Sequence, residues 1–186
     1  RQRALCQTDG MRIITVCLGN ICRSPAAEAV LRRALAREGL THDVTDNSAG
    51  DRPDRGVEVA SAGTADYHVG ERPHQLTIEV GEQLGYEFTT RGAQLTSEDL
   101  ATADLLLVMD ESNRANALAL AADDAQRAKV RLLGEFASDA DTAGVREVPD
   151  PWGHPREQFE AMYQQIEDAV PGVVAFVRQT LRSRGT

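Results

Sequence analysis

The sequence predicts an α/β protein: a four-stranded, parallel, doubly wound sheet with helices on both faces, in a single domain. Two observations predict this fold. Short apolar runs alternate with helical patterns along the chain, and a loop rich in reactive and polar residues directly follows the first run. Such alternation is typical of parallel sheets, whose ligands bind at the carboxyl ends of the strands. With 186 residues and 41% hydrophobic content, the chain can bury one core.

Four apolar runs are the expected strands. The third is apolar throughout, as strands buried on both faces are. Residues 43–55 are rich in Asp, Asn, Gly and Pro and lack periodicity, so we expect an exposed insertion before the second strand. The expected strands are Arg12–Val16, Val57–Ala60, Leu105–Met109 and Val130–Leu133.

Helical patterns lie between and after these runs. Gly39 and Gly85 end two of them, and Thr96-Ser-Glu-Asp99 resembles a capping box that starts a further short helix. Ser24 is a good N-cap for the earliest helix, and Pro25 suits its first position. The expected helices are Ala26–Glu38, His74–Leu84, Asn113–Ala121 and about Glu157–Leu181.

Charge and composition limit the functions open to the chain. A net charge of -9 argues against nucleic acid or an anionic membrane as a partner, and no apolar run approaches the ~20 residues of a membrane span. Three cysteines form no disulfide framework, and the four histidines show no ligand spacing, so we expect no metal and no other cofactor. Residues 1–10 lack the apolar core of a signal peptide. We expect a flexible extension there, one domain over 11–186 and a cytoplasmic location.

The strongest chemical signal is the stretch Cys17-Leu-Gly-Asn-Ile-Cys-Arg-Ser-Pro25. The backbone N–H groups of residues 18 to 23 can curl around one tetrahedral oxyanion, and Gly19 and Asn20 tolerate the unusual dihedrals of such a bowl. The positive end of the following helix points into it. The predicted oxyanion site consists of Leu18, Gly19, Asn20, Ile21, Cys22, Arg23 and Ser24.

Cys17 and Arg23 indicate what this site does. A helix N-terminus and a nearby guanidinium favour the thiolate form of a cysteine, so we expect Cys17 to be a nucleophile placed where a phosphoryl group docks. Arg23 offers that group two parallel N–H donors, which a lysine does not. The alternative is a buried cysteine beside an ordinary helix cap. Arginine, serine and proline at these offsets favour the oxyanion site.

The same stretch closely resembles the signature of the low-molecular-weight protein tyrosine phosphatases. The resemblance implies a strand order of 2-1-3-4, with the loop at the switch point. It also implies an enzyme that hydrolyses phosphotyrosine through a phosphocysteine on Cys17. Four further segments fall in the family's order between about Met11 and Leu181: Ser61-Ala-Gly-Thr64, Tyr67-His-Val-Gly70, Met109-Asp-Glu-Ser-Asn113 and Asp150-Pro-Trp152.

Hydrolysis of an aryl phosphate also needs an acid that protonates the departing oxygen, typically worth about 10²–10⁴ in rate. Pro151 holds Asp150 extended on a loop. From the residues alone, however, Asp-Pro is more often a simple turn, and Asp139 and Asp141 are equal candidates. The resemblance selects Asp150, because the family carries its general acid in an Asp-Pro-aromatic run.

The resemblance also assigns residues to the mouth and the support of the loop. Tyr67 and Trp152 are expected to line an aromatic slot deep enough to favour phosphotyrosine. Asn20 and Ser61 resemble polar residues that hold the loop in shape, and Ser24 can hydrogen-bond the thiolate. The chain departs from the family at two positions: Thr90 replaces a usual histidine, and Gly153 replaces a second aromatic residue.

Cys22 is interpreted as a redox guard of Cys17. A loop wrapped around one phosphate can bring their Cα atoms within the ~4.4–6.8 Å that a disulfide requires. A neighbouring thiol can also trap a sulfenic acid before irreversible oxidation. The alternative is that Cys22 only packs beneath the bowl.

Three other functions stay open. Thioredoxin-coupled arsenate reductases use a similar loop but need further cysteines, and none follows Cys22. Protein-arginine phosphatases resemble Cys-x-Gly-Asn-Thr-Cys-Arg, with threonine in place of Ile21. A non-catalytic phosphopeptide-binding module is disfavoured by the intact Cys17, Arg23 and Asp150. The expected partners are a phosphotyrosine protein and inorganic phosphate or similar oxyanions, and the expected state is a monomer.

Overall fold

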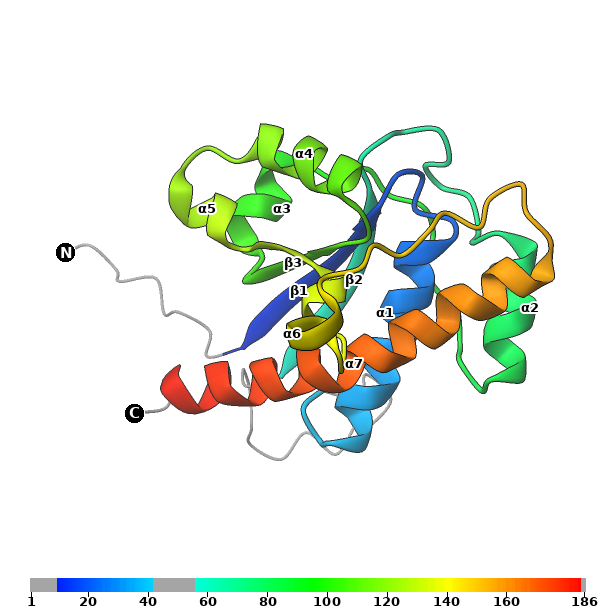
Figure 1. Cartoon of the computed structure of the whole chain (residues 1–186). Helices are drawn as coiled ribbons and strands as arrows, with labels where there is room; N and C mark the ends of the chain where they lie inside the picture. Colours follow the sequence, from blue (N-terminus) through cyan, green and yellow to red (C-terminus); the bar gives the residue numbers. More distant parts are fainter. Residues whose placement is uncertain (1–9, 42–55, 185–186) are drawn as a thin grey trace, which may run out of the picture.

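The computed structural model of the chain describes residues 10–41 and 56–184. The expected N-terminal extension, apart from Gly10, and the expected insertion at 43–55 lie outside the described residues. The described ranges build one sheet with helices on both sides (Figure 1). Among their helices, none is long and apolar enough to cross a membrane.

The sheet in these ranges has four parallel strands in the order β2-β1-β3-β4, which confirms the predicted topology. β1 (Met11–Cys17) and β3 (Leu105–Val108) lie in the middle, between β2 (Val57–Gly63) and β4 (Val130–Leu132). All four residues of β3 are buried, as its apolar run predicts. The carboxyl ends of β1 and β2 lie side by side, because Cys17 pairs in register with Gly63.

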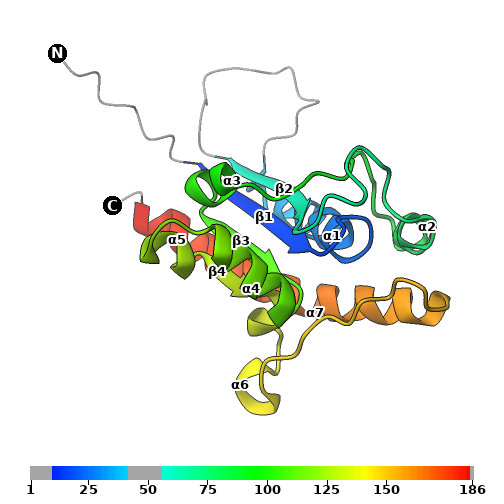
Figure 2. The same cartoon turned by 90° about the horizontal axis from the view of Figure 1, so that it is seen from above.

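The helices form two layers, one on each side of the sheet (Figures 1 and 2). On one side lie α1, α2 and α7, and on the other lie α3, α4 and α5. Short helices η1 and α6 connect β4 to the segment that precedes α7. The bounds are Arg23–Arg37 for α1, Gln75–Gln83 for α2, Ser97–Thr102 for α3, Glu111–Leu120 for α4, Asp124–Ala128 for α5, Leu133–Phe136 for η1, Ala140–Ala143 for α6 and Arg156–Arg184 for α7.

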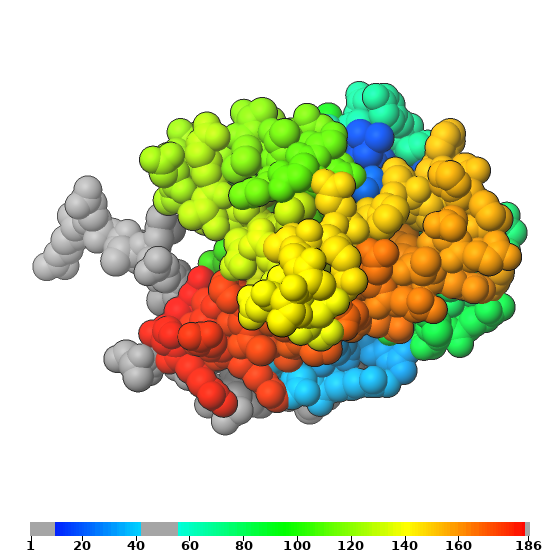
Figure 3. Space-filling model, in the orientation of Figure 1, coloured from blue at the N-terminus to red at the C-terminus, as the bar shows by residue number. Residues whose placement is uncertain are grey.

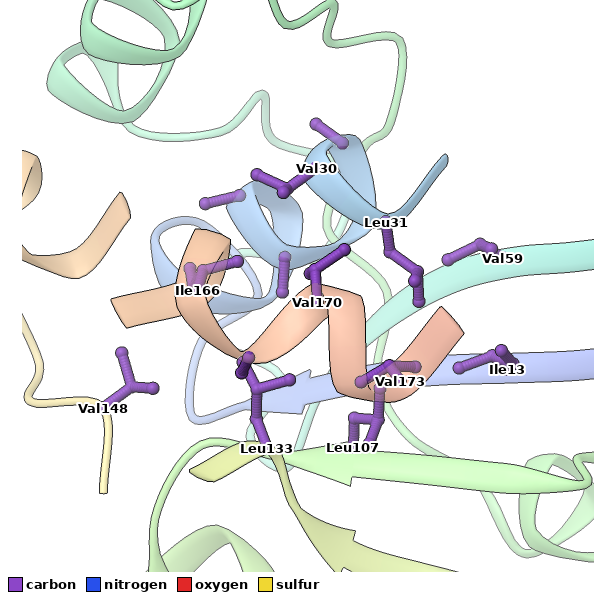
Figure 4. Packing of buried hydrophobic residues seen from close by; sticks show 14 of the residues in the cluster. Ile13, Val30, Leu31, Val59, Leu107, Leu133, Val148, Ile166, Val170 and Val173 are labelled. Atoms are coloured by element: carbon purple, nitrogen blue, oxygen red, sulfur yellow. The ribbon is translucent and has the colours of Figure 1, made fainter. Parts of the chain in front are cut away.

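The larger part of the core lies between the sheet and the layer of α1 and α7. Figure 4 shows side chains of α1 and α7 meeting above the strands. A second buried cluster packs the opposite face of the sheet against α3 and α4. The labelled core residues include Val30 and Leu31 of α1, Ile166, Val170 and Val173 of α7, and Ile13, Val59 and Leu107 of the sheet.

One expectation about the helices was wrong, and three short helices were not foreseen. α1 begins at Arg23, and Ser24 is therefore inside the helix and is not its N-cap; Cys22 occupies that place with no side-chain cap. The Ser24 hydroxyl is instead turned toward Cys17 and Asn20. The sequence also gave no sign of α5, η1 and α6, which span only four or five residues each and are too short to show a helical period.

Gly134 of η1 packs directly against the backbone of the segment that precedes α7. A Cβ at this position would lie 1.8 Å from the carbonyl oxygen of Arg146, so Gly134→Ala must displace backbone on that segment. We expect the free energy of unfolding, measured in urea, to fall by about 1–3 kcal/mol, the usual range for overpacking. A change below about 0.5 kcal/mol, typical of unconstrained surface positions, would show that the two backbones are not in contact.

Candidate active site

The chain between β1 and α1 forms a tight bowl at the carboxyl edge of the sheet. Asn20 takes the left-handed conformation with φ of 56°, the only residue other than glycine to do so in the described ranges. Gly19 does not have a positive φ; a Cβ there would be tight, at 3.0 Å from the His68 ring. In Figure 3 the blue residues after β1 reach the surface between the teal segment after β2 and the orange segment before α7.

Backbone hydrogen bonds from two other segments hold the bowl in place. Thr64 N donates to Cys17 O and Ala65 N donates to Leu18 O, both at 2.9 Å. On the other side, His74 N donates to Ile21 O at 2.7 Å, immediately before α2 begins. The inward N–H groups of the bowl are therefore fixed in direction before any anion binds.

A chain of buried side-chain hydrogen bonds leads to the Cys17 sulfur. Ala93 N donates to Asn20 Oδ1 at 2.9 Å, and Asn20 Nδ2 donates to Ser24 Oγ at 2.9 Å. Ser24 Oγ lies 3.0 Å from Cys17 Sγ and 3.3 Å from Ala62 O. Either atom can be the donor in the contact between Ser24 and Cys17, so Ser24 is placed to hydrogen-bond the Cys17 sulfur.

Thr15 supports the bowl from below and was missed by the sequence reasoning. Its hydroxyl is fully buried in β1 and lies 2.9 Å from Ser24 O and 3.3 Å from Ala60 O. It therefore fixes the first turn of α1 to the sheet. A threonine within an apolar strand is a common pattern, and nothing in the sequence distinguished this one.

Arg23 is buried and held by three acceptors, one after β3 and two on the segment that precedes α7. Nη1 donates to Asp110 Oδ2 at 2.6 Å and to Val148 O at 3.1 Å, and Nη2 donates to Asp150 Oδ2 at 2.9 Å. Burial is the largest influence on the pKa of Arg23 and lowers it, but the hydrogen bond to Asp110 and the negative charges of Cys17 and Asp150 outweigh burial, so the pKa is raised.

The remaining donors of Arg23 lie along one edge of the guanidinium. Both Nη1 hydrogens are engaged, whereas Nε is buried without a hydrogen-bond partner in the described residues. A buried unpaired donor is costly unless a ligand satisfies it. Nε–H and the second Nη2–H form the parallel pair that matches two oxygens of a phosphoryl group.

Asp110 is the second residue that the sequence reasoning missed. It lies at the end of β3, where Oδ1 accepts from Asn113 N at 2.7 Å and caps α4 while Oδ2 holds Arg23. The segment Met109–Asn113 pointed to this position only as a family marker, because an aspartate before a helix reads as a simple N-cap.

A cavity of about 230 Å³ opens above the bowl. Tyr67 and Trp152 both line it and are largely exposed, so the structure brings them together with Cys17 as the aromatic-wall expectation requires. Asp150 also lines it, and its Oδ1 accepts from Trp152 N at 3.2 Å. The remaining lining residues are Leu18, Gly19, Ile21, Cys22 and His68.

Cys22 lies at the bottom of this cavity and is almost fully buried. Burial raises the pKa of its thiol to about 12, while the Thr77 hydroxyl acts in the opposite direction. Thr77 has the weaker effect on the pKa of Cys22, because the Thr77 Oγ1 makes no hydrogen bond of regular geometry in the described part of the chain. Cys22 is therefore a protonated thiol at neutral pH.

The structure does not give Ser61 the loop contact expected of it. Its buried Oγ has no hydrogen-bond partner among the described residues. Thr90 occupies the position where the resemblance leads one to expect a histidine, and its short side chain donates to Glu28 Oε1 at 3.0 Å. Asn20 and Ser24 instead hold the loop, together with Thr15.

Glu28 is buried on α1 and only partly satisfied. Oε1 accepts from Thr90 Oγ1 and, at 2.8 Å, from Arg32 Nη2, whereas Oε2 has no partner within the described ranges. Residues 10–41 and 56–184 contain no group of three or more His, Cys, Asp or Glu side chains placed to hold a metal ion.

The loop of Cys17 to Arg23 and the partners of Arg23 thus lie together at the carboxyl edge of the sheet, beside a cavity that Cys17 and Asp150 line. On a parallel α/β sheet, this arrangement is typical of a phosphatase. A family model described as low molecular weight phosphotyrosine protein phosphatase matches residues 12–56 and 51–183. The chain belongs to that family.

Individual relatives can be aligned with nearly the whole chain. Low molecular weight protein-tyrosine phosphatase A of Mycobacterium tuberculosis is 35% identical over 178 residues, which cover 96% of this chain and 98% of the relative. A crystal structure of protein tyrosine phosphatase from Entamoeba histolytica has a TM-score of 0.77 at 28% identity and covers 91% and 98%. The YwlE arginine phosphatase, a Bacillus subtilis protein, has a TM-score of 0.73 at 25% identity and covers 90% and 96%.

The contact between Thr90 and Glu28 leads to a stability prediction. Thr90→Val keeps the shape but removes a donor to a buried carboxylate, so we expect the free energy of unfolding to fall by about 1.5–3 kcal/mol. Thr64→Val is the matched control, because the Thr64 hydroxyl is buried without a partner in the described residues and its removal should be neutral or stabilising. Equal unfolding free energies for the two variants would mean that the Thr90 hydrogen bond contributes nothing.

Proposed function

We propose that this protein hydrolyses phosphotyrosine in proteins by a two-step reaction with a phosphocysteine intermediate on Cys17. The observation that carries the proposal is the Nε edge of the buried Arg23, the residue that closes the loop begun by Cys17: Nε has no hydrogen-bond partner in the described residues, and Nη2 makes a single hydrogen bond, to Asp150. The phosphoryl group docks on the N–H groups of Leu18 to Ser24, with two oxygens on this edge of Arg23.

In the first step, the Cys17 thiolate attacks phosphorus and the bond to the tyrosine oxygen breaks. Asp150 gives its proton to that oxygen, so tyrosine leaves neutral. Asp150 is paired with Arg23, and a docked dianion competes with Asp150 for the same guanidinium. Ser24 donates to the Cys17 sulfur and lowers the energy of the thiolate.

In the second step, water attacks phosphorus and the S–P bond breaks. Asp150, now a carboxylate, takes a proton from the water, and the bond pair returns to Cys17 as thiolate. Inorganic phosphate leaves the bowl. The hydrogen bond from Ser24 makes the Cys17 sulfur a better leaving group, so one contact assists both steps.

The depth of the slot supports phosphotyrosine as the substrate. Tyr67 and Trp152 stand at the mouth, where they can flank an aryl ring, and a shorter phosphoserine would leave its phosphate above the bowl. Ile21 gives the wall no hydroxyl to orient water, which separates this chain from the threonine-containing arginine-phosphatase pattern. The absence of any cysteine after Cys22 disfavours an arsenate reductase.

A working thiolate requires reducing conditions, which supports a cytoplasmic location. The site as described lies within one chain, which supports a monomer as the active form. Inorganic phosphate and similar oxyanions are the small ligands that the bowl fits. A phosphotyrosine segment of another protein is the expected macromolecular partner.

The proposed function is tested on one preparation with a phosphotyrosine peptide, phosphoarginine and arsenate. We expect turnover of the peptide to dominate, and Cys17→Ser to abolish it because a serine alkoxide does not form at neutral pH. Binding of inorganic phosphate by that variant, measured by calorimetry, should persist because the N–H groups remain. Turnover by Cys17→Ser within tenfold of wild type would contradict the nucleophile assignment.

Asp150→Asn removes the acid and keeps the size of the side chain. We expect aryl phosphates with poor leaving groups to slow by about 10²-fold or more, within the usual range of acid catalysis. Substrates whose leaving group needs no proton should slow much less. A defect of equal size across leaving groups of different pKa would remove Asp150 as the acid.

The redox role of Cys22 leads to a prediction about pH. Peroxide oxidises Cys17 to the sulfenic acid, the Cys22 thiolate attacks its sulfur, and hydroxide leaves as the disulfide forms. Because the pKa of Cys22 is raised to about 12, its thiolate fraction, and with it disulfide formation, should rise about tenfold per pH unit between pH 7 and 9.

Mass spectrometry of the 17–22 disulfide and recovery of activity in dithiothreitol follow this reaction. Cys22→Ser should keep most activity in reductant and recover poorly after peroxide. Full recovery by that variant would show that Cys22 only packs beneath the bowl.

A further inference from the structure

Glu147 lies three residues before Asp150, and the proposed reaction gives it no part. Its side chain is exposed, yet Oε1 accepts a hydrogen bond of 2.8 Å from the backbone nitrogen of Glu111, 36 residues earlier in the chain. Glu111 is the first residue of α4, and its N–H is among those that a helix leaves unpaired and to which a carboxylate is attracted. This bond ties the segment that precedes α7 to the element that follows β3.

The bond between Glu147 and Glu111 closes a ring of contacts around Arg23. Nη1 of Arg23 donates to Asp110 Oδ2 at 2.6 Å, and the residue after Asp110 is Glu111. The residue after Glu147 is Val148, whose carbonyl oxygen accepts from the same Nη1 at 3.1 Å. Every member of a closed ring restricts its neighbours, so the position of Val148 depends on Glu147 as well as on Arg23.

The segment around Glu147 has no helix or strand that would hold it by regular hydrogen bonds. Residues 144–151 belong to neither kind of element, so single contacts set their position. Besides the ring, Val148 N donates to Met109 O at 2.9 Å, and the backbone of Arg146 packs against Gly134. The loss of any one of these contacts leaves fewer to hold the segment at the edge of the sheet.

Two prolines transmit the position of Val148 to Asp150. Pro149 and Pro151 have a fixed φ, and each also disfavours the helical conformation of the residue before it. Val148 and Asp150 are these preceding residues, so the four residues from Val148 to Pro151 are conformationally restricted. A displacement of Val148 is therefore passed on to Asp150, because the chain between them has little freedom to absorb it.

The ring matters most when a phosphoryl group is docked. In the structure, Asp150 Oδ2 accepts from Nη2 of Arg23 at 2.9 Å. A docked phosphoryl group competes for this Nη2, so the proposed acid must stay in place while its own ion pair is weakened. The bonds of the ring use Nη1 of Arg23 and the N–H of Glu111, which take no part in that competition.

We infer that Glu147 is a positioning residue, which through its bond to the Glu111 N–H holds Asp150 in place for proton transfer. The inference rests on the proposed function for the role of Asp150 as the acid. Glu147 acts through Asp150, so its loss should slow substrates whose departing oxygen needs a proton and should spare those whose departing oxygen does not.

The experiment compares two substitutions in the full chain. Glu147→Ala removes the acceptor, whereas Glu147→Gln keeps an oxygen that can accept the same bond and removes the charge. For Glu147→Ala we expect kcat/KM for a phosphotyrosine peptide to fall about tenfold, a part of the ~10²–10⁴ that an acid contributes. For dinitrophenyl phosphate, whose leaving group needs no proton, kcat/KM should stay within about twofold. Glu147→Gln should stay within about twofold of wild type on both substrates, since the amide oxygen is an acceptor.

Two further readouts do not depend on turnover. With inorganic phosphate at saturation, hydrogen exchange of the Val148 N–H should be about tenfold faster in Glu147→Ala and unchanged in Glu147→Gln, because exchange reports local opening. The dissociation constant for phosphate should not change in either variant, since neither alters the loop or Arg23. Glu98→Ala is the matched control: Glu98 is an exposed residue of α3 whose carboxylate has no partner among the described residues, and its removal should change none of these values.

The inference is overturned if Glu147→Ala slows both substrates equally, if Glu147→Gln loses as much as Glu147→Ala, or if the exchange of the Val148 N–H is unchanged. Exchange is measured without turnover, so the two proposals can fail separately. A wild-type protein that leaves phosphotyrosine intact, but whose Val148 exchange responds to Glu147→Ala, would contradict the proposed function and not the hold of Glu147 on the segment.

Discussion

The buried guanidinium of Arg23 is the point on which the site depends. A charge taken out of water requires partners, and these come from three places: Asp110 after β3, the Val148 carbonyl and Asp150. By satisfying Arg23, the chain also fixes the segment that carries Asp150, the proposed acid, relative to the loop that carries Cys17, the proposed nucleophile. One ion therefore positions both groups, and its Nε has no partner in the described residues.

A second constraint acts inside the loop. Asn20 is held in a left-handed conformation that an ordinary residue avoids, and its amide connects Ala93 to Ser24. The strain is offset by hydrogen bonds that end on the Cys17 sulfur, so the interactions that shape the loop also reach the proposed nucleophile. The segment around Gly92 hydrogen-bonds both this loop and the segment that carries His68.

The sequence predicted the sheet, its four strands and the Cys17–Arg23 loop, because these depend on local patterns: apolar runs, spacing and helix signals. It identified Asp150 only through resemblance. The partners of Arg23 lie 87 to 127 residues away along the chain, and no local pattern reveals such contacts. Ser24 illustrates the limit. Its residue type predicted an N-cap, but in the folded chain its hydroxyl contacts the Cys17 sulfur. Ser61 shows the reverse, because a family pattern predicted a loop contact that its buried hydroxyl does not make within the described residues.

A crystal structure with inorganic phosphate bound tests the account of Arg23 most directly. We expect Nη1 to stay on Asp110 and Val148 while Nε and Nη2 each reach a different phosphate oxygen at about 2.7–2.9 Å, the usual length for charge-assisted bonds. Asp150 should part from Nη2 or share it with the phosphate. A bound phosphate that leaves Nε without a partner, or that draws Nη1 away from Asp110, would contradict the claim that this ion pair prepares the site.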